Sequence, residues 1–87
     1  MKVKFASSAT KHFVAKQEIL RIIKSKTGIK IGKSRENMDK IAWIGDRDLG
    51  QKIEIIGINF ITHYYVIHAM PTRDRGGDEN EYLENLW

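Results

Sequence analysis

The chain has 87 residues, a net charge of +4 and no cysteine. This length builds one small domain with a single modest core, and the lack of cysteine excludes both a disulfide framework and a thiolate metal site. No apolar run approaches the length of a membrane span and residues 1–5 lack the apolar core of a signal peptide, so we expect a cytoplasmic protein with no membrane partner.

The first half of the chain predicts one strand and one helix. Residues 3–5 alternate between apolar and charged side chains, as in a short strand. Apolar residues recur at helical spacing over 16–26, and Gly28 follows as a stop signal. Residues 27–40 are polar and basic, which predicts a loop with a short strand at 29–31.

The second half predicts an antiparallel meander. Residues 41–45, 52–60 and 64–70 are rich in the β-branched and aromatic side chains that strands favour, and turn residues separate them. Gly57, inside the middle run, indicates a β-bulge or a close backbone approach.

The C-terminal segment, residues 78–87, is acidic and amphipathic. Asp78 is followed three residues later by Glu81, as at the start of a helix. We therefore expect one α+β domain over residues 1–77, followed by an acidic helix or tail at 78–87. The expected architecture is a small antiparallel sheet of three to four strands, packed by the helix of the N-terminal half and by a short C-terminal helix.

Charge divides the chain into a basic first part and an acidic second part. Residues 1–40 hold 11 Lys and Arg against 3 acids, and residues 41–87 hold 4 against 8. Such a basic half suits a polyanion or an acidic partner protein. A solubilising lysine surface is the alternative interpretation.

The predicted strand at 64–70 ends in residues suited to phosphodiester chemistry. It carries His68, and the only proline separates it from Arg73 and Arg75. An imidazole beside two permanent cations can bind, and also cleave, a phosphodiester. The alternative is that His68 packs in the sheet and the arginines are solvated.

Two motifs stand out, Lys11-His12 ahead of the helix and Ile67-His68-Ala69-Met70 at the strand end. With these motifs, the chain resembles, over most of residues 5–75, the small BrnT-like ribonuclease toxins of bacterial toxin–antitoxin pairs, which are distantly related to the RelE fold. The resemblance implies a metal-independent endoribonuclease that acts on RNA and is neutralised by a cognate antitoxin protein. It also matches Arg73 and Arg75 to the basic residues after the family's last strand, whereas the acidic segment 78–87 departs from the family's arginine-rich C-terminal helix.

Metal-free RNA cleavage requires a base for the 2′-hydroxyl proton, an acid for the leaving 5′-oxygen and cations for the charged intermediate. The candidates for the acid and base are His12 and His68, and Arg73 and Arg75 are the candidate cations. Glu54 is a weaker candidate base. Whether the two histidines reach one phosphate depends on how the helix lies on the sheet.

The predicted nucleic-acid contacts are lysines before and within the helix, namely Lys11, Lys16 and Lys24. We expect no cofactor and no metal, because His12, His63 and His68 lack metal-ligand spacing and an unbroken strand would place the last two on opposite faces. A non-catalytic basic module that binds nucleic acid or an acidic protein is the alternative to an enzyme.

Overall fold

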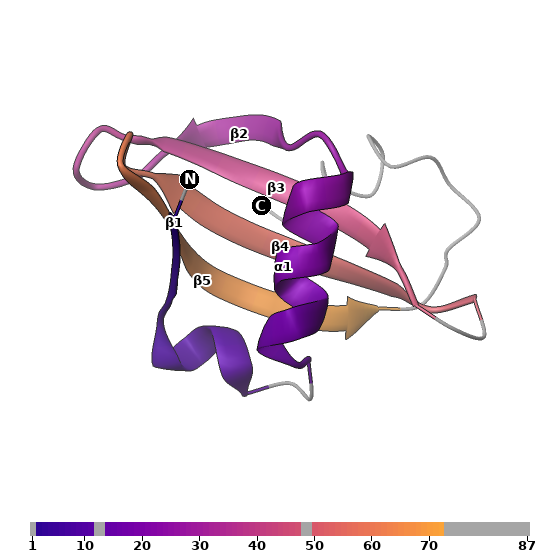
Figure 1. Cartoon of the computed structure of the whole chain (residues 1–87). Helices are drawn as coiled ribbons and strands as arrows, with labels where there is room; N and C mark the ends of the chain where they lie inside the picture. Colours follow the sequence, from indigo (N-terminus) through magenta and orange to yellow (C-terminus); the bar gives the residue numbers. More distant parts are fainter. Residues whose placement is uncertain (1, 12–13, 48–49, 73–87) are drawn as a thin grey trace.

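The computed structural model describes residues 2–11, 14–47 and 50–72, which form a five-stranded sheet with a helix across one face (Figure 1). In chain order the elements are β1 (Lys2–Phe5), the short 3-10 helix η1 (Ser7–Thr10), α1 (Lys16–Ser25), β2 (Ile29–Lys33), β3 (Asp39–Asp46), β4 (Lys52–Asn59) and β5 (His63–Thr72). The predicted C-terminal helix at 78–87 lies outside the described residues.

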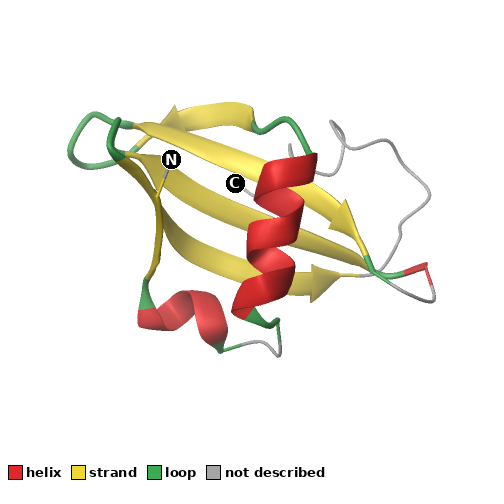
Figure 2. Cartoon of the chain, viewed as in Figure 1, coloured by secondary structure: helices red, strands yellow, loops and turns green. Residues whose placement is uncertain are grey.

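The sheet has the strand order β1-β5-β4-β3-β2 (Figure 2). Strands β2 to β5 form an antiparallel meander, whereas β1 pairs with β5 in parallel. The α+β class is therefore confirmed, but the prediction of three to four purely antiparallel strands is wrong. It failed because β1 pairs with a strand about 60 residues later, and no local pattern reports such a distant partner.

Helix α1 forms where apolar residues recur at helical spacing. Glu18 lies in its first turn and Lys24 in its last, each at the end where the helix dipole favours its charge. Ile19 and Ile22 are buried against the sheet. The glycine at position 45 of β3 allows this close approach, because a Cβ there would lie 2.5 Å from the Ile22 side chain.

A β-bulge in β5 changes which side chains share a face. The register with β4 shifts between Ile56 and Gly57, which confirms the bulge that Gly57 indicated. Val66 and Ala69 both enter the core under α1. Ile67 and His68, which lie between them, therefore face the other side of the sheet. Consequently, His63 and His68 lie on the same face, contrary to the expectation for an unbroken strand.

We call the side of the sheet opposite α1 the far face. Cross-strand pairing places Glu54 opposite Ile44 and Met70, and His68 opposite Ile56, on this face. An apolar cluster surrounds these residues, formed by Ala42, Ile44 and Ile56 with the partly buried Ile31 and Ile67. The far face therefore combines an apolar surface with two titratable side chains.

An ion pair fixes the first turn of α1 to the end of β3. Arg47 donates from Nε to Glu18 Oε2 at 3.0 Å and from Nη2 to Glu18 Oε1 at 2.6 Å. These hydrogen bonds hold the pKa of the Glu18 carboxyl below its ordinary value. Within the described ranges no helix is long and apolar enough to cross a membrane.

We expect Glu18→Gln to lower the free energy of unfolding by about 0.5–1 kcal/mol at neutral pH. Because the pKa is lower in the folded protein, the carboxylate stabilises the fold above the ordinary glutamate pKa of about 4.3. This contribution is lost as the pH falls through the lower folded value. Urea denaturation of both proteins at neutral and at acid pH measures the effect; an equal difference at the two pH values would contradict it.

Candidate functional site

The candidate site is a carboxylate and an imidazole on neighbouring strands of the far face. Because Ile56 pairs with His68 and Glu54 pairs with Met70, Glu54 and His68 are diagonal neighbours. The His68 Nε2 atom lies 3.5 Å from Glu54 Oε1. This is ion-pair distance, longer than the roughly 2.7–3.2 Å of an N–H···O hydrogen bond.

The two side chains differ in burial. The Glu54 side chain is only 8% exposed, whereas that of His68 is 32% exposed. Among the described residues, none hydrogen-bonds to Glu54 Oε2. A buried carboxylate is costly unless a cation or donor compensates it. The arrangement therefore suits an imidazole that exchanges protons with a bound molecule while the carboxylate behind it orients the ring and balances its charge.

Glu54, the weaker candidate base from the sequence, is the titratable neighbour that the structure places beside His68. It is the single charged residue in the run Ile53-Glu54-Ile55-Ile56 of β4, and it is the only buried polar or charged side chain of the described residues. An acid within an isoleucine-rich strand was the available signal. Its contact with His68, however, depends on the β4–β5 register.

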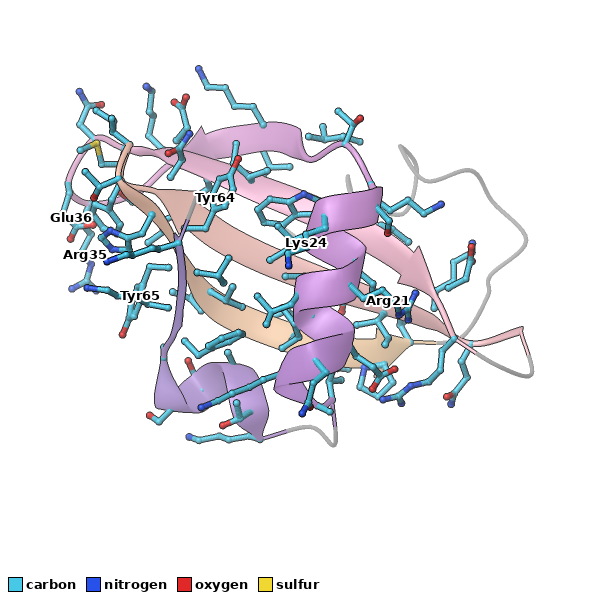
Figure 3. All side chains as sticks on the ribbon, viewed as in Figure 1. Arg21, Lys24, Arg35, Glu36, Tyr64 and Tyr65 are labelled. Carbon is cyan, nitrogen blue, oxygen red and sulfur yellow. The ribbon has the colours of Figure 1, made fainter. Side chains whose placement is uncertain are left out.

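The predicted phosphate-binding lysines of α1 lie on the opposite side of the sheet from His68. Lys16 Nζ lies 5.4 Å from the centre of the Phe5 ring. Lys24 lines a cavity of about 350 Å³ between α1 and the strands β1 and β5 (Figure 3). The other lining residues are Val3, Leu20, Ile23 and Tyr64. The sheet therefore separates these two lysines from His68, and one phosphate cannot contact both groups.

The remaining predicted site residues are only partly described. Lys11 is exposed and directly follows η1. His12, Arg73 and Arg75 lie outside the described residues. His68 is the one predicted catalytic residue that lies among the described residues. The titratable side chain next to it is Glu54.

Several of the described lysines are paired with aspartates. Lys30 and Lys33 lie 3.4 and 2.7 Å from Asp39 Oδ1, and hydrogen bonding, chiefly from Lys33, lowers the pKa of that carboxyl. Lys52 donates to Asp46 at 2.9 Å and lowers its pKa in the same way. For Lys30 and Lys33, which lie within residues 1–40, this pairing is compatible with the solubilising lysine surface that is the alternative interpretation of the basic half.

His63 has a local role in the β4–β5 hairpin. Its ring stacks on Phe60 at a centroid distance of 5.3 Å, and its Nδ1 lies 3.0 Å from Thr62 Oγ1. The Tyr65 ring lies 6.4 Å from the Phe60 ring and is tilted to it by 60°. Across the described parts of the chain, no three His, Asp or Glu side chains gather as metal ligands.

No family model matches the sequence, and neither a curated protein nor a solved structure is significantly similar to it. The functional conclusion therefore depends on the chemistry of the residues described above.

Proposed function

We propose that the protein is a metal-independent endoribonuclease in which His68 and Glu54 act together. The observation that carries the proposal is the 3.5 Å approach of the partly exposed His68 ring to the buried Glu54 carboxylate. The excess of Lys and Arg in the first 40 residues supports a polyanionic substrate. The resemblance of residues 5–75 to BrnT-like toxins supports RNA as that substrate.

In the proposed reaction the 2′-oxygen of a ribose attacks the adjacent phosphorus, so that a P–O2′ bond forms and the P–O5′ bond breaks. A base takes the 2′-hydroxyl proton and an acid gives a proton to the leaving O5′. We assign these transfers to His68 and His12, with Glu54 orienting the His68 ring. Arg73 and Arg75 stabilise the charged phosphorane. The products are a 2′,3′-cyclic phosphate and a 5′-hydroxyl.

The biological role that we propose is that of a toxin in a type II toxin–antitoxin pair. Such a toxin acts on cytoplasmic RNA and is neutralised by a cognate antitoxin protein. The test is to incubate the purified full-length protein with total RNA in the presence of a chelator. We expect fragments that end in 2′,3′-cyclic phosphate, and RNA that stays intact with and without divalent ions would overturn the proposal.

A non-catalytic module that binds nucleic acid is the second candidate. The observation that favours it is the location of Lys16 and Lys24 on α1, on the other side of the sheet from His68. RNA bound to α1 alone would not reach the Glu54–His68 pair. Binding without cleavage in the same assay would support this candidate.

Under both candidates, RNA affinity depends on Lys11, Lys16 and Lys24. We expect log affinity to fall linearly with log salt concentration, because bound lysines release counterions from the phosphates. Replacing one of these lysines by Ala should make the slope shallower by about 0.7 to 0.9 for each phosphate that the variant no longer neutralises.

The matched control for this experiment is Lys33→Ala. Lys33 is exposed but is paired with Asp39 at 2.7 Å, so its removal should leave the salt slope unchanged. Fluorescence anisotropy with a labelled single-stranded RNA measures both slopes. Affinity that is indifferent to salt would contradict the prediction.

A further inference from the structure

The cavity beside Lys24 lies on the face of the sheet that α1 covers, away from the Glu54–His68 pair. Its volume of about 350 Å³ falls within the range of about 300–1,000 Å³ that is typical of small-molecule sites. Protein cores are close-packed, and few voids in them exceed the size of a water molecule. An opening of this size beside the core therefore has room for a ligand.

A strand pair and a helix build the walls of this cavity. Val3 of β1 pairs in register with Tyr64 of β5, and both side chains pack against the core cluster on the α1 side. On α1, Leu20, Ile23 and Lys24 are three and four residues apart, so they share one face of the helix. Figure 3 shows Lys24 and Tyr64 on these two walls. Regular secondary structure therefore holds the cavity open in a fixed shape.

The lining combines apolar side chains with one cation. Val3, Leu20 and Ile23 offer only hydrocarbon, and Tyr64 offers a ring with a hydroxyl group. Lys24 is exposed, and among the described residues no carboxylate lies within ion-pair distance of its ammonium group. Small-molecule sites are mostly apolar, with a few polar groups that fix the orientation of the ligand. This lining complements a molecule that carries a negative charge at one end of an apolar body.

We propose that the cavity binds a small amphipathic carboxylate, with its apolar chain against Val3, Leu20 and Ile23 and its carboxylate at Lys24. The volume equals that of about 12 water molecules at about 30 Å³ each, so it suits a ligand of roughly ten non-hydrogen atoms. Octanoate is a straight-chain carboxylate of this size. The site goes beyond the proposed RNA chemistry and does not depend on it.

Titration of the full-length protein with octanoate, followed by methyl NMR, tests the site. We expect saturable shifts of the methyl signals of Val3, Leu20 and Ile23. The signals of Ile44 and Ile56, on the far face, should not move. Each methylene that enters an apolar site gains about fourfold in affinity, so octanoate should bind about tenfold more tightly than hexanoate. The absence of saturable shifts, equal shifts on both faces, or equal affinities for the two acids would overturn the proposal.

The position of the carboxylate is tested with Lys24→Gln. This variant should bind octanoate about two- to fivefold more weakly, the effect of losing an exposed ion pair, and should bind 1-octanol as the original chain does. The matched control is Lys26→Gln, because Lys26 directly follows α1 and lies 4.0 Å from Asp46, outside the cavity lining. Its affinity for octanoate should stay unchanged. Unweakened binding to Lys24→Gln, or equal losses in the two variants, would contradict the assigned ion pair.

Filling the cavity gives an independent test. Val3→Phe places a larger side chain in the cavity from β1, and Leu20→Phe does so from α1. Both positions are half-buried, and unchanged methyl signals of Ile44 and Ile56 would show that the fold is kept. Each folded variant should lose the saturable shift at Ile23. Octanoate that binds a filled variant as tightly as the original chain would place the ligand elsewhere and overturn the proposal.

Discussion

Replacing His68 by Ala is expected to lower the rate of RNA cleavage by about 10²- to 10⁴-fold, the usual contribution of a positioned acid or base. Growth inhibition on expression in bacteria should disappear with it. The reason is geometric: the His68 ring is partly exposed on the far face and has the Glu54 carboxylate 3.5 Å behind it. Rates measured on a defined RNA and growth curves under induction check the prediction.

Two further variants separate loss of chemistry from loss of fold. His68→Gln keeps a polar group beside Glu54, so it should fold as the original chain does and still fail to cleave. His63→Ala removes an imidazole from the same face, at the β4–β5 hairpin, and should keep full activity. A folded His68→Gln protein that cleaves at the original rate would show that His68 has no chemical role.

Replacing Trp43 by Ala is expected to lower the free energy of unfolding by about 3–5 kcal/mol, the range for large aromatic side chains in cores. The indole is 2% exposed and meets the Tyr64 ring edge-on at 5.1 Å. It also lies close to β4, where a Cβ at Gly57 would be 3.2 Å from the ring. Its removal leaves a cavity in the core cluster that also contains Ile19, Ile55 and Val66.

Such a loss is large for a domain of this size, because total stabilities run about 5–15 kcal/mol. We expect the thermal midpoint to fall by at least about 12 °C. Ile61→Ala is the matched control, since Ile61 is 76% exposed and its removal should change the midpoint little. A loss below about 1 kcal/mol for Trp43→Ala would contradict the assigned core.

The elements that sequence reasoning predicted are those with a local signal. The spacing of apolar residues indicated the helix at 16–26, and β-branched runs indicated the strands at 41–45, 52–60 and 64–70. The pairing of β1 with β5 was missed because it joins distant segments. The strand at 29–33 is longer than predicted, because pairing with β3 extends it past Gly32 to Lys33.

The site was predicted only in part, for a reason of register. The sequence predicted His68 near the end of a strand at 64–70, but β5 continues to Thr72 and His68 lies inside it; its neighbour depends on how β4 and β5 align. Gly57 indicated a bulge without telling which strand carries the extra residue. Since that residue lies in β5, His68 joins the face that holds Glu54.

The placement of the α1 lysines was also beyond the local pattern. Helical spacing tells which side of α1 is apolar, and Ile19 and Ile22 are buried as expected. It does not tell which face of the sheet the helix covers. Because α1 covers the face opposite His68, the sheet lies between His68 and the side chains of Lys16 and Lys24.

The central claim is that Glu54 and His68 cleave RNA as one unit, and a double-mutant cycle tests it most directly. Cleavage rates are measured in chelator for the original chain, Glu54→Gln, His68→Gln and the double variant. If the two residues act together, each single variant is slower than the original, and the double variant is no slower than His68→Gln alone. Rates that equal the original, or losses that simply add, would contradict the account.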